Sequence, residues 1–364
     1  MRLDKLYLEG FLSYDKLYLD FADGINVLVG QNAVGKTNLA ESVYYCSVGK
    51  SARGLKDKEL LSWSGADHAR IRLRVERRFG AHTVDVYIDA QGKKRITVDE
   101  LPIARIGELM GVVNAVYFSP DEMKLIKDSP ADRRRFLDIS LCQTDKVYFY
   151  KLSEYNKLLA QRNKLLKNYK DSRDLPEMSA IIVEKMADRQ EYVVKKRKEF
   201  VEKIAPLAAA RHRKITDGKE DLSLAYETEE IDFDDIKGSF LRLYEQNFEK
   251  DRRLEYTTVG CHRDDLKIIA GGIDVRKYGS QGQQRTAVLS LKLAEVDGIY
   301  STVGEYPVVI LDDVASELDR GRLKKLFESL SGVQVLVTTT EYDEDFGPAT
   351  VFDVTKGKIA KRFG

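Results

Sequence analysis

Cysteine is scarce in this chain, with 3 residues among 364, and tryptophan occurs once. Cys46, Cys142 and Cys261 are far apart and form no C-x-x-C pair. The sequence therefore predicts neither a disulfide framework nor a zinc site, and it favours a reducing cytoplasm. No apolar run approaches the roughly 18 residues of a membrane span, and the N-terminus has no signal-peptide core. We expect a soluble protein that is not exported and has no membrane partner.

An excess of one charge is also missing. The 60 basic and 59 acidic side chains leave a formal net charge of +1. Bulk charge therefore indicates neither a nucleic acid nor a membrane as partner, and any nucleic-acid surface must come from local clustering. The length and the hydrophobic share of 43% are ample for a globular core and favour two or three domains.

The chain is organised around residues 30–37, which match the phosphate-loop pattern G-x-x-x-x-G-K-S/T in full. A β-branched run at 25–29 precedes the motif and helical spacing follows it, so an incidental glycine-rich turn is the weaker interpretation. The glycines let successive N–H groups point inward, and the next helix adds its positive end. We expect Lys36 to reach the β and γ phosphates and Thr37 to hold Mg²⁺. The predicted nucleotide-binding residues are Gly30, Gln31, Asn32, Ala33, Val34, Gly35, Lys36, Thr37 and Asn38.

A strand-rich segment surrounds this loop. Strand-like patterns at 2–9 and 16–21 precede it, and a helix is predicted from the loop to about Cys46. Alternating apolar residues between 71 and 98 then predict an antiparallel meander with a basic polar face. That face either contacts DNA phosphates or carries solvated charges that protect a sheet edge. The predicted DNA-binding residues are Arg70, Arg72, Arg74, Lys93, Lys94 and Arg95.

Beyond residue 121 the apolar period changes to alternating steps of four and three, which predicts long helices in an antiparallel lobe. Charged residues within the seams argue against a regular coiled coil, because Arg and Lys are tolerated there chiefly where their stems snorkel. Leu175-Pro176 is expected between the two long helices, and Pro206 is expected to kink or end the second. The predicted elements are helices at 148–169, 182–207 and about 233–252, with a short strand at 223–226.

The second half of the predicted chemistry lies near the C-terminus. Ser280, in the motif S-x-G-Q, opens a helical pattern that has Gly282 in its first turn. The apolar run 307–311 ends in Asp312 and Asp313, as does the magnesium-organising strand beside a phosphate loop. Alone, such a run is weak evidence, because a buried strand that meets a helix cap has the same pattern. Its position after the phosphate loop makes it strong, and it predicts that Asp312 joins Thr37 at the metal.

Together these motifs resemble an ATP-binding cassette ATPase head: a phosphate loop, an S-x-G-Q signature, a strand ending in Asp-Asp, and S-x-L-D at 316–319. Within that superfamily the chain is most similar to the RecF family of bacterial recombination mediators. The blocks that carry this resemblance span essentially the full chain and lie at 118–121, 129–138, 260–266 and 311–319.

The resemblance implies an α/β fold: an ABC-type P-loop ATPase head, with a mixed sheet and an antiparallel meander, and an inserted α-helical lobe. The implied head consists of residues 1–122 and 256–364, and the lobe of residues 123–255. Two ATP molecules would lie between two subunits of a homodimer, with Ser280 and Gly282 of one subunit at the γ-phosphate held by the other. The implied catalytic residues are Lys36, Asp312, Asp313 and Ser280.

The resemblance also implies a function. It predicts a weak, cytoplasmic ATPase that uses ATP and Mg²⁺ and acts in DNA repair, recombination, replication and the SOS response. DNA, as a duplex, gap or junction, is the implied substrate. RecR and RecO are the implied partner proteins, and RecA is the recombinase whose loading the protein would assist.

Some positions depart from related heads. Asp313 stands where a glutamate usually serves as general base, and a misplacement of about 1 Å can cost on the order of a hundredfold, so we expect slow turnover. The glutamine that senses magnesium is expected to be replaced within 119–121, and the switch histidine by Thr340. Cys261 stands where the family more often has proline, and the neighbouring His262 and Arg263 are either DNA or interface residues or a structural pair.

Other functions share parts of this pattern. The ATPase subunit of a membrane transporter has the same nucleotide motifs, but it would not explain the inserted helices. A structural-maintenance or zinc-hook relative would need hundreds of coiled-coil residues or a C-x-x-C tip. A metabolic kinase would leave the S-x-G-Q motif unexplained.

Overall fold

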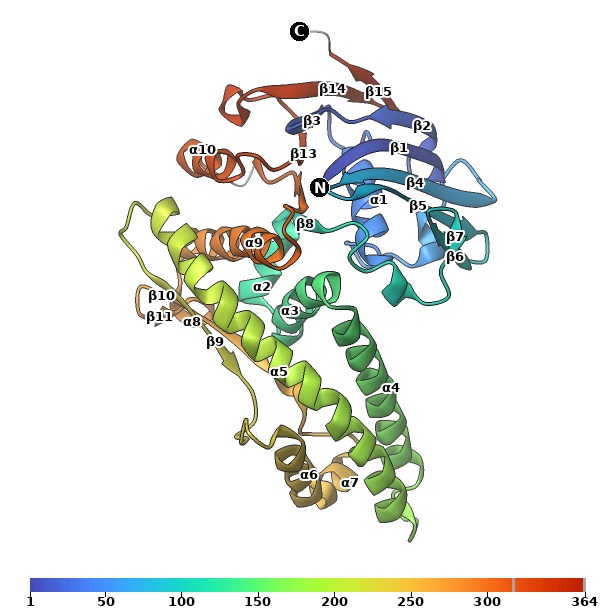
Figure 1. Ribbon diagram of the computed structural model, residues 1–364, viewed down its shortest axis with the longest axis vertical. Helices are drawn as coiled ribbons and strands as arrows, with labels where there is room; N and C mark the ends of the chain where they lie inside the picture. The colour runs from blue at the N-terminus through green and yellow to red at the C-terminus, as the bar shows by residue number, and fades with distance from the viewer. Residues whose placement is uncertain (316–317, 363–364) are drawn as a thin grey trace.

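The computed structural model describes residues 1–315 and 318–362. Figure 1 shows a strand-rich upper half that holds both chain termini and an elongated, mostly helical lower half. The predicted α/β class with a helical lobe is confirmed by the order of the elements. Within the described residues, no helix is both long enough and apolar enough to cross a membrane.

The first sheet is antiparallel and contains the predicted meander. Its strand order is β2-β1-β4-β5-β6-β7. Along β4 the apolar residues Ile71, Leu73 and Val75 are buried and the intervening Arg72 and Arg74 are exposed, so one face packs on the core and the other meets solvent. The strands are β1 (Arg2–Phe11), β2 (Tyr14–Asp20), β4 (His68–Arg77), β5 (Gly80–Asp89), β6 (Lys94–Val98) and β7 (Leu101–Pro102).

The second sheet carries the nucleotide motifs. Its order is β15-β14-β3-β13-β12-β8, and every neighbouring pair is parallel except β14 with β15. The carboxyl ends of its parallel strands therefore meet at one edge, which is where such sheets bind ligands. The strands are β3 (Ile25–Val29), β8 (Ala115–Phe118), β12 (Val308–Asp312), β13 (Val335–Thr339), β14 (Ala349–Thr355) and β15 (Lys358–Lys361).

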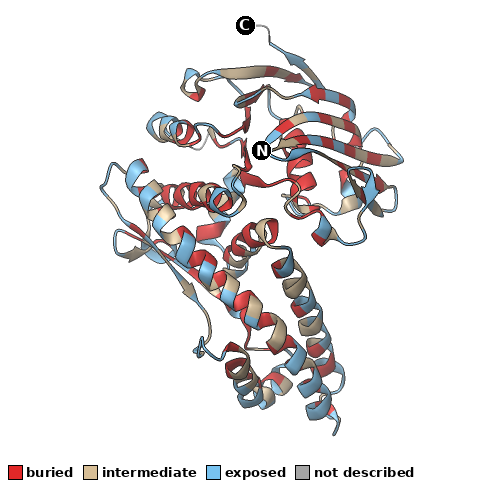
Figure 2. Ribbon diagram, viewed as in Figure 1, coloured by how far each residue is buried: buried red, intermediate tan, exposed pale blue. Residues whose placement is uncertain are grey.

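Helix α9 (Gln281–Val303) joins the two halves of the molecule. Its residues Leu289, Leu293 and Val296 belong to the core beneath the second sheet, whereas Leu291 and Ala294 belong to the core of the lobe. Figure 2 shows buried residues along most of this helix. The other helices against the sheets are α1 (Lys36–Val48), which follows the phosphate loop, and α10 (Arg320–Ser329).

The lobe is built on two long helices, α4 (Lys146–Asn168) and α5 (Leu175–Ile215), as the sequence predicts. Leu175-Pro176 opens α5 instead of lying before it, because proline at the first helical turn lacks only an N–H that has no partner there. Of the two outcomes expected for Pro206, a kink or the end of the helix, the second is wrong. The helix continues to Ile215 because the turns after the proline, including Ala208 and His212, are buried.

Shorter elements complete the lobe. The helix predicted at 233–252 is divided at Asn247 into α6 (Ile236–Gln246) and α7 (Phe248–Leu254). Strand β10 (Asp265–Ala270) pairs with β9 (Leu222–Glu227), so the chain after residue 256 first returns to a lobe strand. The division of the chain at 122 and 255 stays a prediction. The remaining elements are α2 (Lys124–Lys127), α3 (Pro130–Thr144), β11 (Ile273–Asp274) and α8 (Val275–Tyr278).

Candidate nucleotide site

The phosphate loop has the backbone that its glycines allow. Gly35 has a φ of 112° and Ala33 a φ of 64°. A Cβ at Gly35 would lie 2.4 Å from Ser13 Oγ, and a Cβ at Gly30 would lie 2.4 Å from the carbonyl oxygen of Val354. Both distances are shorter than real contacts, so only glycine fits at these two positions.

Lys36 is folded back over the loop that it follows. Its Nζ donates to the carbonyl oxygens of Gly30 at 2.6 Å and Gln31 at 2.7 Å. Burial lowers the pKa of Lys36, and the nearby charges of Asp313 and Asp312 oppose that effect. The ammonium is therefore held inside the loop, next to the two carboxylates at the end of β12.

Asp312 accepts hydrogen bonds from three other residues of the site. Its Oδ1 accepts hydrogen bonds from Thr37 Oγ1 at 2.9 Å and Thr338 Oγ1 at 2.6 Å, and its Oδ2 accepts one from Tyr117 OH at 2.6 Å. Burial and the charge of Asp312 raise the pKa of Tyr117, so its hydroxyl remains a donor. Four elements, α1, β8, β12 and β13, thus converge on one carboxylate.

The groups around Asp312 suit Mg²⁺. The hydroxyl of Thr37 and the carboxylate of Asp312 are hard oxygen donors, which this ion prefers. No group of three or more His, Cys, Asp or Glu that could hold a metal occurs among residues 1–315 and 318–362. Proteins often supply Mg²⁺ with only one or two ligands and leave the rest to phosphates and water.

Asp313 adopts a left-handed backbone with a φ of 55°. Its N–H donates to the carbonyl oxygen of Thr338 at 3.2 Å and to Thr338 Oγ1 at 3.0 Å, which fixes the backbone against β13. The residue lines a cavity of about 480 Å³ together with Thr37, Ser119 and Asp312. Asp313 thus borders the same cavity as the predicted metal-binding residues Thr37 and Asp312.

Arg53 and Lys292 are two of the four basic residues that line this cavity, and neither of them was assigned to the site from the sequence. Arg53 donates to Asn38 Oδ1 at 3.0 Å and pairs with the buried Glu41, so it is tied to helix α1. Lys292 of α9 lies 2.6 Å from Glu295 and 3.7 Å from Glu122. Burial disfavours the charge of Lys292, but the two glutamates raise its pKa above the ordinary value. Neither residue belongs to a local motif, and only the fold brings Lys292 to the site.

Ser280 lies at the start of α9 and caps it. Its Oγ accepts from the N–H of Gln283 at 3.2 Å, and Gln283 Oε1 accepts from the N–H of Ser280 at 2.9 Å. A Cβ at Gly282 would meet Arg322 Nη2 at 3.5 Å and Ser280 Oγ at 3.9 Å, which are ordinary contacts. Packing among the described residues therefore gives no reason for glycine there. Of the S-x-L-D motif, Ser316 and Glu317 lie outside the described residues, and Asp319 caps α10.

Most of the predicted DNA-binding residues have carboxylate partners. Arg70 bonds both oxygens of Asp85, with a closest distance of 2.7 Å, and Arg74 lies 3.0 Å from Asp4. Arg72 lies 3.8 Å from Glu100, and Lys94 lies 3.1 Å from Asp57. Lys93 and Arg95 are exposed. The charge of this face is thus partly balanced, and its contact with DNA stays a prediction.

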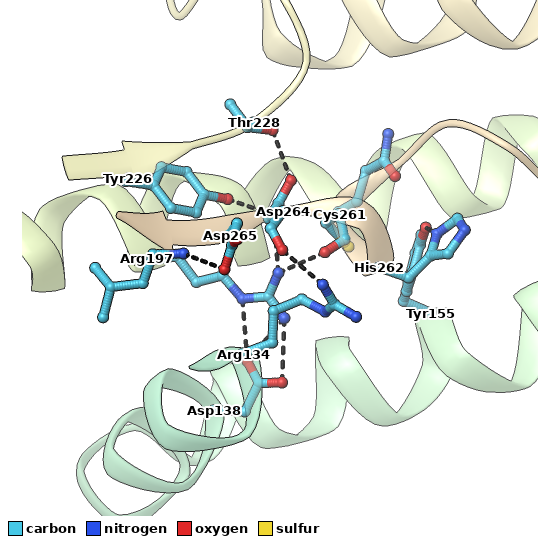
Figure 3. A network of polar contacts seen from close by, with 12 residues as sticks. Arg134, Asp138, Tyr155, Arg197, Tyr226, Thr228, Cys261, His262, Asp264 and Asp265 are labelled. Carbon is cyan, nitrogen blue, oxygen red and sulfur yellow. Dashed lines mark hydrogen bonds and ion pairs between the residues drawn. The ribbon is translucent and has the colours of Figure 1, made fainter. Parts of the chain in front are cut away.

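The block at 260–266 lies in a polar network of the lobe, which Figure 3 shows. Arg197 of α5 donates to the carbonyl oxygen of Cys261 at 2.6 Å and bonds Asp264 and Asp138 at 2.8 Å each. His262 Nδ1 lies 2.7 Å from Tyr155 OH and its Nε2 lies 3.1 Å from the carbonyl oxygen of Thr257. Of the two interpretations of His262, these contacts favour the structural one.

Comparison with known proteins identifies the family of this chain. A family model described as the RecF/RecN/SMC N terminal domain matches residues 2–345. The "DNA replication and repair protein RecF" of Clostridium botulinum (strain Loch Maree / Type A3) is 40% identical over 366 residues, which cover 99% of this chain and 100% of the relative. The chain belongs to the RecF family. A RecF of Lachnoclostridium phytofermentans is 40% identical over 94% of each chain.

Solved structures agree with membership of the RecF family. A structure of the recombination mediator protein RecF with ATP in the RecFOR pathway superposes with a TM-score of 0.92 at 33% identity, covering 100% of this chain and 98% of that one. An Smc head domain from Pyrococcus furiosus gives a TM-score of 0.58 at 19% identity, covering 99% and 96%, and supports the fold alone. The predicted ABC-type ATPase fold is confirmed.

Proposed function

We propose that this chain is a slow, Mg²⁺-dependent ATPase that forms a homodimer on ATP and acts on DNA in recombinational repair. Its relatives are named DNA replication and repair proteins, and a structural neighbour is a recombination mediator with ATP. We extend those roles to this chain in the cytoplasm, with RecR and RecO as partners and RecA loading at DNA gaps as the outcome. A role in a membrane transporter is not favoured.

One observation carries this proposal. The chain has a complete phosphate loop, but the Ser280 end of its signature helix does not line the nucleotide cavity of the same chain. Thr37 and Asp312 meet at 2.9 Å, whereas Ser280 is exposed and neither it nor Gly282 lines the cavity beside them. Among residues 1–315 and 318–362, Gly282 has room for a side chain, so a demand from outside the chain would account for glycine. A γ-phosphate held by a second copy, at the positive end of α9, would supply that demand.

Within the site each residue has a separate task. The loop N–H groups bind phosphate, and Lys36 would exchange its two carbonyl partners for the β and γ phosphates. Thr37 and Asp312 would hold Mg²⁺, which when bound neutralises charge that develops on the phosphates. Asp313 would orient the attacking water and accept its proton. Its carboxylate is one methylene shorter than that of glutamate, which is the basis for expecting slow turnover.

The test measures molecular mass in solution. We expect sedimentation to show a dimer with ATP or a slowly hydrolysed analogue and a monomer with ADP, each with and without gapped DNA. Lys36→Ala should remain folded by circular dichroism and stay monomeric with ATP, because the lysine belongs to the loop and not to a hydrophobic core. A Lys36→Ala protein that binds ATP and dimerises as well as the wild type would overturn the proposal.

A further inference from the structure

Helix α4 of the lobe has an unusual charge distribution. It contains six basic residues and one carboxylate, Glu154, which Arg189 of α5 holds at 3.0 Å. The buried residues of α4 recur at steps of about seven, so one side of the helix packs on the lobe and the opposite side faces solvent. These buried residues are Tyr148, Tyr155, Arg162, Leu165 and Leu166.

Four exposed lysines follow the outer side of this helix. Lys157 and Lys164 each come two positions after a buried residue, which places them about 200° around the helix from it. Lys146 lies on the same side of the helix as these two lysines, and Lys167 lies on the adjacent side. We call Lys146, Lys157, Lys164 and Lys167 the α4 lysine stripe. No carboxylate of residues 1–315 or 318–362 is within ion-pair distance of any of the four.

Three half-buried lysines of the lobe have carboxylate partners, whereas some exposed lysines outside α4, such as Lys185 and Lys195 of α5, have none among the described residues. Lys151, on another side of α4, lies 3.3 Å from Asp188. Lys196 lies 2.8 Å from Glu199, and Lys237 lies 2.6 Å from Glu184. The arginines of strand β4 also have carboxylate partners. The stripe is distinguished by its arrangement: four lysines that are unpaired within the described residues gather along one side of a single helix.

A further positive charge lies near the head end of the stripe. Tyr150 lies on the same side of α4, and the guanidinium of the exposed Arg105 lies 5.9 Å from the centre of its ring. Arg105 belongs to the segment between β7 and β8. Figure 1 shows α4 starting below β6 and β7 and running to the far end of the lobe. Arg105 thus adds a positive charge near the start of α4.

We infer that the α4 lysine stripe binds the backbone of duplex DNA. From Lys146 to Lys167 the helix advances about 32 Å, which is close to the roughly 34 Å of one duplex turn. Lysines act as point charges toward phosphate and carry no base preference. A single strand would require aromatic side chains for base stacking, and the one ring in line with the lysines, Tyr150, is covered by Arg105.

This inference rests on the proposed action on DNA, and the experiment separates the two. Duplex binding of the full-length protein with ATP is measured by fluorescence anisotropy across a series of salt concentrations. The variant Lys157→Gln/Lys164→Gln/Lys167→Gln keeps helix-forming side chains and removes three charges. We expect its plot of log affinity against log salt to be flatter by up to about 2.7, because each phosphate contact contributes about 0.9.

Two control variants are measured beside the stripe variant. Lys151→Gln/Lys196→Gln/Lys237→Gln removes the same charge from paired lysines, and we expect a slope close to that of the wild type. Replacing the three stripe lysines with arginine should retain binding. An equal loss in both glutamine variants, an unchanged slope in the stripe variant, or a loss confined to single-stranded DNA would each overturn the inference. If the wild type itself binds no duplex DNA, the result contradicts the proposed action on DNA and not only the role of the stripe. ATP binding and circular dichroism verify folding.

Discussion

At the residue scale, the chemistry of the site depends on a few hydrogen bonds. Asp312 accepts bonds from Thr37, Thr338 and Tyr117, so its carboxylate is fixed in position before any nucleotide arrives. Preorganised groups of this kind lower a barrier because they need no rearrangement during the reaction. The same carboxylate is the one that the sequence motif predicts for the metal.

A first prediction concerns the rate of hydrolysis. Since Asp313 has a shorter side chain than glutamate, we expect a basal turnover well below the enzyme median of about 10 per second. Asp312→Asn should abolish Mg²⁺-dependent phosphate release, because an amide NH₂ cannot accept the bonds that a carboxylate oxygen accepts. Steady-state phosphate release measures both. A basal rate at or above that median would contradict the assignment of Asp313.

A second prediction concerns pH. Burial lowers the pKa of His262 to about 4 from an ordinary 6.5. Between these values the unfolded chain binds more protons than the native one, so stability is complete above about pH 6.5 and is lost as the pH falls toward 4. From pH 7.5 to 5.0 we expect this residue to account for about 2 kcal/mol of lost unfolding free energy.

Urea unfolding at the two pH values checks this contribution. Carboxylates elsewhere also titrate, so the informative quantity is the difference between the wild type and His262→Gln. The variant loses contacts to Tyr155 and Thr257 at every pH, but its remaining pH dependence should be smaller by about 2 kcal/mol. Equal pH dependence in the two proteins would show that His262 is not held neutral.

At the element scale, α9 performs two tasks that one experiment can separate. Its N-terminus is capped by Ser280, and the same end is proposed to face the γ-phosphate of a partner subunit. Replacing a serine cap by alanine typically costs about 1 kcal/mol, so a simple deletion would confuse loss of the cap with loss of the interface. Side chains that retain the cap avoid this problem.

A third prediction uses such side chains. Ser280→Asp keeps a good cap but places a negative charge toward the phosphate, whereas Ser280→Asn keeps the cap and stays neutral. We expect both to bind ATP. In sedimentation with ATP, we expect only the aspartate variant to lose dimerisation, by tenfold or more in dissociation constant, since 1.4 kcal/mol corresponds to a factor of ten. If the aspartate variant dimerises like the wild type, Ser280 does not lie at the shared site.

At the scale of the whole molecule, two surfaces are candidates for DNA binding. The strand face has arginines paired with carboxylates, whereas the α4 lysine stripe has no carboxylate partner in the part of the chain that the structure describes. An arginine that must leave a carboxylate to reach a phosphate gains less than a free lysine does, because it loses its existing pair. The net charge of +1 conceals this difference.

A fourth prediction follows for the strand face. Arg70→Gln/Arg72→Gln/Arg74→Gln removes as much charge as the stripe variant, but we expect the salt slope of duplex binding to change by less than about 1. Anisotropy titrations of both variants beside the wild type make the comparison. A change of about 2.7 in the arginine variant would return DNA binding to the strand face, as the sequence alone suggests.

The sequence by itself determined the parts of the protein that depend on contiguous residues. The phosphate loop at 30–37, the helix start at Ser280, the carboxylates at the end of β12 and the alternation in β4 all follow from local backbone and side-chain requirements. These features are confirmed in their expected elements. Local rules apply because glycine torsions, capping bonds and the period of two do not depend on distant contacts.

Only the tertiary structure decided which charges are balanced. Charged seam residues were expected to extend their ends to solvent, but Arg162 is fully buried and lies 2.7 Å from Asp251, 89 positions later in the chain. Arg70 and Lys157 look equally basic in the sequence, yet the first is paired with Asp85 and the second is not paired within the described residues. The reason is physical: an ion pair depends on separation in space of a few ångströms, which separation along the chain does not specify.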